Sequence, residues 1–242
     1  MILLALRRLC DRPQHPDHEV LGQCERAALA AALRLRGELG GTVTAVAVGP
    51  AQREDRVLAI ALRAGCDEGI RVQDPALDDP DYLVVAQVLA AVARRISAKL
   101  VLCGDRSQDE RQGATGAAVA ELLDAPHLAQ VVDLEAHDGR LRAVQRTGGR
   151  LHTWHCSLPA VMCLASFPRT RHPDGEGDGE REARGRGITE LDLGELALDR
   201  SALGERSRLI GPARPTRASS RAIMLASPAE LVERLARERL IG

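Results

Sequence analysis

A loop between an apolar strand and a helix carries the residues best suited to ligand binding. Residues 100–123 read LVLCGDRSQDERQGATGAAVAELL. Their loop holds two glycines, two hydroxyl residues and three carboxylates: Gly113, Gly116, Ser107, Thr115, Asp105, Asp109 and Glu110. The glycines let the backbone approach a ligand, and the first turn of a helix offers unpaired N–H groups and a positive dipole end to a phosphate. The carboxylates could accept hydrogen bonds from a ribose hydroxyl or an adenine amine. These residue types predict a nucleotide site.

The familiar phosphate-binding signatures are missing from this loop. It lacks the G-K-[ST] ending of a P-loop, and its glycines do not follow the G-x-G-x-x-G spacing after a first strand. A solvated loop without a ligand therefore stays open as the alternative. The residues supply no catalytic acid, base or nucleophile, so no catalytic residue is predicted.

The elements around the loop alternate between strand and helix. Apolar strands are expected at residues 1–6, 42–49, 69–72 and 98–104, and amphipathic helices at 19–41, 53–65, 80–96 and after the loop. Such alternation requires right-handed crossovers and a parallel sheet. The predicted fold class is therefore α/β, a mostly parallel, Rossmann-like sheet with helices on both faces. Ligands of such sheets bind outside the carboxyl ends of the strands, where this loop begins.

The character of the sequence changes after Pro126. Antiparallel strands are expected at 127–165, with tight turns at Asp138-Gly139 and Gly148-Gly149. Within the run HTWHC, the period-2 pattern predicts a core Trp154 and an exposed His155.

Three regions are therefore expected along the chain. They are an α/β domain at 1–167, a charged, glycine-rich linker at 168–187 and a C-terminal arm at 188–242. The arm should end in a helix that Ser227 caps, with Pro228 at its first position and Glu230 completing a capping box. We expect its apolar side to dock on a partner subunit. That side consists of Leu231, Val232 and Leu235.

Composition limits the classes of function. Lys and Arg number 33 against 34 Asp and Glu, and the net charge of -1 gives no general attraction to nucleic acid or an anionic membrane. Only three aromatics, Tyr82, Trp154 and Phe167, could stack on bases. The six cysteines never form a C-x-x-C pair, which favours reduced thiols over disulfides or a metal site. No apolar run is long enough for a signal peptide or a membrane span, so a cytoplasmic protein is expected.

Several strings resemble the β subunit of electron transfer flavoprotein. AVGPAQREDRVLAIALRAGCDEGIRV, residues 47–72, is similar to that family's second strand, G-P-A-Q turn and following helix. KLVLCGDRSQDERQGATG, residues 99–116, resembles its nucleotide loop at Gly104, Asp109, Thr115 and Gly116. SLPAVMCLA resembles its LPAVVT strand, and LVERLARERLIG its closing helix. The resemblance covers nearly the whole chain.

The resemblance implies a heterodimer that carries electrons. An α subunit would hold most of a redox-active FAD, while the β subunit closes over it and buries an AMP, or in some branches a second FAD. A dehydrogenase or quinone reductase would be the redox partner. The flavin supplies the chemistry, and protein groups tune it. The resemblance places the nucleotide contacts on these residues: Ala5, Leu21, Gly22, Gln23, Cys24, Val48, Gly104, Asp105, Arg106, Ser107, Gln108, Asp109, Glu110, Gln112, Gly113, Ala114, Thr115 and Gly116.

The chain also departs from the family pattern. Leu21-Gly22-Gln23 stands where the family has Asn-Pro-Phe, and Gly113-Ala114 stands where it has Asn-Gln. The charged, glycine-rich run at 173–187 replaces the recognition loop. Two alternatives follow: an adenine-nucleotide-binding or ATP-hydrolase-like protein of the same fold, and a degenerate β-like subunit without nucleotide. ATP-cleaving relatives usually carry S-G-G-x-D-S where this chain reads RRLCDRP, which argues against the first alternative.

Overall fold

The computed structural model of the chain describes residues 1–6, 21–78, 80–106, 113–137, 140–166, 187–201, 203 and 225–240. They belong to two compact units, Met1–Arg208 and Leu209–Gly242.

Nine strands of the described residues form one sheet in the first unit, in the order β7-β6-β5-β8-β4-β1-β2-β3-β9. Their bounds are β1 Ile2–Leu6, β2 Val43–Val48, β3 Glu68–Val72, β4 Leu100–Gly104, β5 His127–His137, β6 Arg140–Thr147, β7 Arg150–Cys156, β8 Ala160–Leu164 and β9 Ile188–Leu191. From β8 through β4, β1, β2 and β3 to β9, each strand pairs in parallel with the next strand of this order. The predicted α/β class with a mostly parallel sheet is confirmed.

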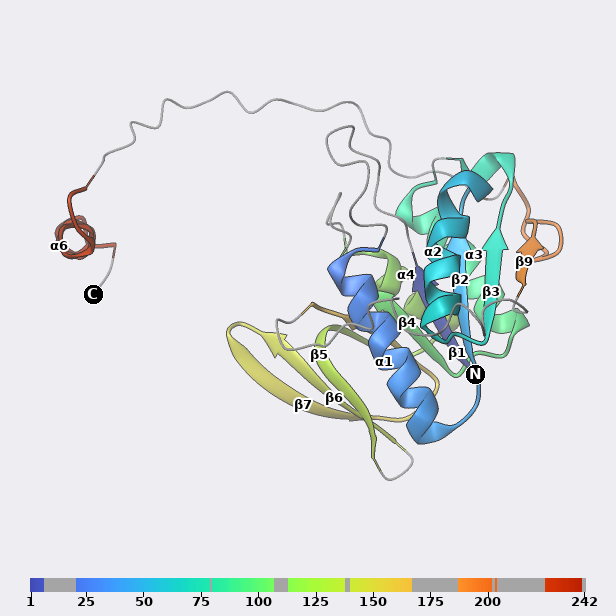
Figure 1. Ribbon diagram of the computed structural model, residues 1–242, viewed down its shortest axis with the longest axis horizontal. Helices are drawn as coiled ribbons and strands as arrows, with labels where there is room; N and C mark the ends of the chain where they lie inside the picture. The colour runs from blue at the N-terminus through green and yellow to red at the C-terminus, as the bar shows by residue number, and fades with distance from the viewer. Residues whose placement is uncertain are drawn as a thin grey trace. The chain divides into compact units, whose positions relative to one another are not determined.

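Helices cover both faces of the sheet (Figure 1). They are α1 Gln23–Leu39, α2 Ala51–Ala64, α3 Tyr82–Arg95 and α4 Thr115–Leu123, with a 3-10 turn η1 at Pro75–Leu77. In β1, Ile2, Leu4 and Leu6 pack with α1 and α2, whereas Leu3 packs with α3 and α4. Because neighbouring side chains point to opposite faces, a strand covered on both sides must be apolar throughout, as the sequence of β1 is.

The first helix is shorter than its sequence pattern suggests. It begins at Gln23 instead of residue 19, because Gly22 is extended, with φ -68° and ψ 164°. Leu21 is fully buried before it. Gly40, one residue before the predicted end of the helix at residue 41, ends it with φ 71°.

The antiparallel prediction holds only for β5, β6 and β7. Gly148 and Gly149 form the expected tight turn, with φ values of 56° and 75°, whereas Asp138-Gly139 lies outside the described residues. The prediction was wrong for β8, which pairs in parallel with both β4 and β5. All five residues of β8 are buried, as expected of a central strand of a parallel sheet.

The prediction that Trp154 is a core residue was also wrong. Its side chain is 47% exposed, because it lies on β7, the last strand of the sheet. Its Nε1 donates to Oε1 of Gln145 at 3.1 Å. His155 is exposed, as predicted.

The predicted C-terminal arm starts too early. Residues 188–191 form β9, which pairs in parallel with β3 and therefore belongs to the sheet of the first unit. Most of the predicted linker, residues 168–186, lies outside the described residues.

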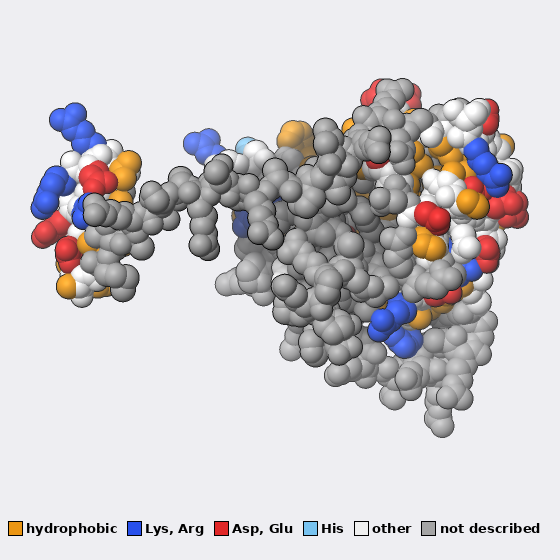
Figure 2. All heavy atoms as spheres, turned by 90° about the horizontal axis from the view of Figure 1, so that it is seen from above, with side chains coloured by type: hydrophobic (Ala, Val, Ile, Leu, Met, Phe, Trp, Pro, Cys, Tyr) orange, Lys and Arg blue, Asp and Glu red, His pale blue; other side chains and the backbone are white. Residues whose placement is uncertain are grey.

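The second unit contains helix α6, Pro228–Arg237. Ser227 Oγ accepts a hydrogen bond from the Glu230 amide at 3.2 Å, so the predicted cap is confirmed. The Glu230 carboxylate reaches back to the amide of Ala226 at 2.8 Å, one residue further than a standard capping box. Figure 2 shows charged and hydrophobic side chains together on the surface of this helix. No helix among the described residues is long and apolar enough to cross a membrane.

Candidate nucleotide site

The carboxyl edge of the sheet has a point where the chain changes direction. From β1 the chain runs through α1 to β2 on one side, whereas from β4 it runs through α4 toward β5 and β8 on the other. Open α/β sheets bind ligands in the crevice at such a switch point. Here the ends of β1 and β4 and the starts of α1 and α4 lie at this switch point.

Gly104, at the end of β4, lies directly against the first turn of α1. A Cβ built on Gly104 would be 3.1 Å from Cβ of Cys24 and 3.1 Å from Cδ of Glu25. Any side chain at this position would push α1 away from the sheet. The structure thus brings together Cys24 and Gly104, two of the predicted nucleotide contacts that are far apart in sequence.

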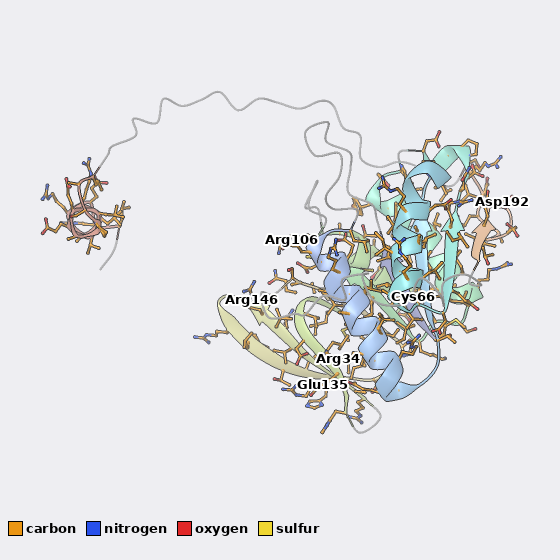
Figure 3. All side chains as sticks on the ribbon, in the orientation of Figure 1. Arg34, Cys66, Arg106, Glu135, Arg146 and Asp192 are labelled. Atoms are coloured by element: carbon orange, nitrogen blue, oxygen red, sulfur yellow. The ribbon has the colours of Figure 1, made fainter. Side chains whose placement is uncertain are left out.

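Asp105 fastens the start of the loop to neighbouring strands. Its amide donates to the carbonyl of Leu164 at 2.8 Å, and its Oδ1 accepts from the amide of Gln130 at 2.8 Å. Its Oδ2 accepts from Nε and Nη2 of Arg106 at 3.2 and 3.1 Å. Both oxygens of this buried carboxylate therefore have partners within the protein, which makes Asp105 a brace of the loop. Figure 3 shows Arg106 beside the first turn of α1.

The two described ends of the loop lie close together. Gly113 has φ 64°, and a Cβ there would be 2.9 Å from the carbonyl oxygen of Asp105. This is a position that only glycine fits well, because of both its φ and its contact. The residues between the two ends that were predicted as contacts lie outside the described residues: Ser107, Gln108, Asp109, Glu110 and Gln112.

Helix α4 begins at the switch point without a side-chain cap. Its N-cap residue is Ala114, which has no hydrogen-bonding side chain, and Thr115 is half-buried. Gly22 before α1 and Pro50 before α2 also lack a side-chain acceptor. Helix α3, in contrast, is capped by Asp81, whose Oδ1 accepts from Leu83 and Val84 at 3.0 and 2.9 Å. Three helix starts along this edge can therefore offer N–H groups to a ligand.

Gly116 has a packing role that the sequence analysis did not detect. A Cβ at this position would be 2.1 Å from Sγ of Cys163 on β8. Gly116 is therefore required for α4 to lie on β8, in addition to any contact it makes with a ligand.

A cluster of two thiols and an imidazole lies beneath the start of α4. Cys103 and Cys163 are directly paired on β4 and β8, and His127 Nε2 is 3.4 Å from Cys163 Sγ. A hydrogen bond with Cys103 and burial raise the pKa of Cys163 far above its usual value. The hydrogen bond with Cys163 raises the pKa of His127; burial opposes this change, and the charge of Asp105 adds to it. Although Cys103, Cys163 and His127 are of metal-ligating type, no three or more His, Cys, Asp or Glu residues in the described part of the chain are arranged to hold a metal ion.

The remaining predicted contacts lie along the same edge. Leu21 and Gly22 are buried, Ala5 and Val48 are half-buried near the ends of β1 and β2, and Gln23 is exposed. Gln23 Oε1 accepts a hydrogen bond from Ser166 Oγ at 3.3 Å.

A cavity of about 250 Å³ lies at the opposite, amino edge of the sheet. Arg94, Lys99 and Pro159 are among the residues that line it. It is therefore separate from the candidate nucleotide site.

The sheet and its strand order define a class of protein: a mostly parallel α/β domain with a topological switch point between β1 and β4. An electron transfer flavoprotein domain matches residues 15–193 of the chain. The chain belongs to the electron transfer flavoprotein family.

Its similarity to known relatives is moderate. It is 32% identical over 166 residues to the electron transfer flavoprotein subunit beta of Methylophilus methylotrophus, covering 67% of this chain and 62% of that protein. It is 27% identical over 218 residues to the subunit beta of Bacillus subtilis, covering 89% and 84%. It is 31% identical over 144 residues to protein FixA of Azotobacter vinelandii, covering 57% and 51%. The resemblance to β subunits is confirmed.

Proposed function

We propose that the chain is the β-like subunit of an electron-transferring flavoprotein heterodimer and binds AMP at the carboxyl edge of its sheet. An α-like subunit holds most of the FAD, which carries one or two electrons when bound. A dehydrogenase or quinone reductase exchanges electrons with the heterodimer in the cytoplasm. The observation that carries the proposal is the switch point at the carboxyl ends of β1 and β4, where α1 packs onto Gly104.

The charges around the switch point orient the AMP. The first turn of α1 contains Glu25, a carboxylate that is only 6% exposed and lies against Gly104. This carboxylate repels a phosphate but can accept a hydrogen bond from a ribose hydroxyl or an adenine amine. The first turn of α4 contains no acidic residue. The phosphate therefore binds at α4, where the backbone of Gly113 and Ala114 and the hydroxyl of Thr115 are available.

The partner subunit also covers helix α6. Leu231 and Val232 are 45% and 56% exposed, and no residue of α6 is buried. A helix whose apolar side has no cover within its own unit favours docking on another protein. We therefore place the α-like subunit on this side of α6.

A second candidate, a β-like subunit without nucleotide, has specific support. Gly116 is explained by its contact with Cys163, and both oxygens of Asp105 are engaged within the protein. Neither residue therefore requires a ligand.

Ligand analysis separates these candidates. The chain is co-expressed with an α-like subunit, the complex is purified, and acid-released ligands are identified by mass and absorbance. FAD with AMP supports the proposal, and two FAD per heterodimer indicate that the second site takes flavin. FAD alone supports the subunit without nucleotide. A monomer that retains ATP would refute the electron-carrier proposal.

A further inference from the structure

The β6–β7 hairpin, residues 140–156, carries charge of one sign only. It contains Arg140, Arg142, Arg146 and Arg150 but no Asp or Glu, although the whole chain has a net charge of -1. At the end of the first unit where β3 and β9 lie, Figure 2 shows acidic and basic side chains interspersed. The hairpin is thus a basic element on a protein in which acidic residues outnumber basic ones elsewhere.

One arginine of the hairpin, Arg142, forms an ion pair with Glu135 on the neighbouring strand. Arg142 donates to Oε1 of Glu135 on β5 at 2.8 Å. Arg140 and Arg150 are exposed, one at the start of β6 and the other at the start of β7. Figure 3 shows Arg146 on the same hairpin, beyond Glu135 and Arg34. An anionic partner would therefore find exposed positive side chains, Arg140 and Arg150, at the two ends of the hairpin.

Strand β7 is also an open edge. It stands at the end of the sheet, and residues 150–155 are all exposed. The two-residue turn makes Thr147 and Arg150 a hydrogen-bonded pair, so that Leu151, Thr153 and His155 direct their backbone N–H and C=O groups outward.

Natural edges are usually protected by charges, proline or bulges. Strand β7 has one charged residue, Arg150, and its Leu151 and Trp154 are 65% and 47% exposed. This edge therefore has the backbone groups and the apolar side chains that an added strand needs.

We propose that an extended acidic segment of the α-like subunit adds to the edge of β7 as a further strand. Backbone hydrogen bonds to Leu151, Thr153 and His155 would fix its register, and Leu151 on one face of β7 and Trp154 on the other would contact apolar side chains on the corresponding faces of the added strand. Its carboxylates would meet Arg140 and Arg150. A second copy of this chain is disfavoured, because pairing two β7 strands would bring two basic hairpins together.

The inference rests on the proposed function for the identity of the partner, and binding affinity tests it separately. Arg140→Glu/Arg150→Glu reverses the charge at both ends of the hairpin. Thr153→Pro removes an outward N–H without removing a bond to β6. Arg63→Glu is the matched control, because Arg63 is exposed in the last turn of α2, a different element. Each full-length variant is titrated against the purified α-like subunit, and circular dichroism and thermal denaturation verify that it is folded.

The charge-reversed variant should bind about tenfold more weakly at low salt, with a smaller difference at high salt. Thr153→Pro should weaken binding at every salt concentration, and Arg63→Glu should match the wild type. The inference is overturned if both folded hairpin variants bind the α-like subunit with unchanged affinity. It is also overturned if the variants lose only association between copies of this chain and still bind the α-like subunit normally.

The ligand content of the same complexes keeps the two proposals apart. A complex that retains FAD and AMP and ignores the hairpin variants refutes only the docking surface. A complex that depends on the hairpin but contains no flavin refutes only the proposed function. If the wild-type chain does not bind the α-like subunit, both are refuted.

Discussion

Replacing Gly116 by alanine should destabilise the first unit through one contact. The new Cβ would be 2.1 Å from Cys163 Sγ, and Cys163 is 2% exposed on a central strand, beside Cys103 and His127. Since this thiol has little room to move, either α4 or β8 must shift. Overpacking of this kind costs about 1–3 kcal/mol. Alanine would return up to about 1 kcal/mol through its better helix propensity. A net loss of about 1–2 kcal/mol is therefore expected.

A double-mutant cycle shows whether Cys163 is the cause. Cys163→Ala removes the sulfur and leaves a small void, so it should destabilise slightly by itself. Combined with Gly116→Ala, it provides room for the new methyl group, and the double variant should be more stable than Gly116→Ala alone. Chemical denaturation followed by circular dichroism measures all four proteins. Additive effects of the two substitutions, or a Gly116→Ala variant as stable as the wild type, would refute this reasoning.

Three further predictions concern separate parts of the molecule. Burial alone would raise the pKa of Asp74. Hydrogen bonds from the Ala76 amide and Arg200 have a larger, opposite effect, so the pKa is lowered overall. Its stabilisation is therefore complete above the unfolded-state pKa and is lost as the pH falls through the folded-state pKa. Asp74→Asn should flatten the acid limb of a stability–pH profile, and an unchanged profile would contradict this role. Thr115→Val should lower the AMP content of the purified heterodimer at unchanged FAD content, whereas equal AMP content would exclude the hydroxyl as a contact. Leu231→Asp should weaken binding to the α-like subunit without changing the thermal stability of the first unit, and unchanged affinity would remove α6 from the interface.

The layered core follows directly from local sequence patterns. Strands β1, β2 and β4 appear as largely apolar runs because helices cover both of their faces. Gly40 and Gly65 end their helices with positive φ, close to the predicted ends of those helices. The Ser227 cap depends on residues within one turn, and it too was predicted correctly. These features are local, so the sequence pattern contains the information that specifies them.

The errors concern contacts that depend on strand order. The alternation in HTWHC is real, but β7 is an edge strand, and a period-2 pattern does not show whether anything covers the face that Trp154 occupies. In the same way, AVMCL resembles any buried strand. Its parallel pairing with β4, which places Cys163 beside Cys103, depends on the order of the whole sheet. The position of the candidate site can be predicted because its two helix starts follow strands of the parallel sheet along the chain. The cysteine cluster beneath it could not be predicted, because it depends on the pairing of β8 with β4.

The contact between Gly116 and Cys163 joins the core to the proposed phosphate site. Helix α4 can present its first N–H groups at the carboxyl edge only if its backbone lies close to β8, and Cys163 allows this approach only because residue 116 lacks a side chain. Asp105 fixes the other end of the loop through Gln130 on β5 and Leu164 on β8, two strands that lie on the same side of β4. The position of the loop is thus determined by β5 and β8 at one end and by the packing of α4 at the other. Since both constraints are buried and independent of a ligand, the helix start should keep its position when the nucleotide is removed.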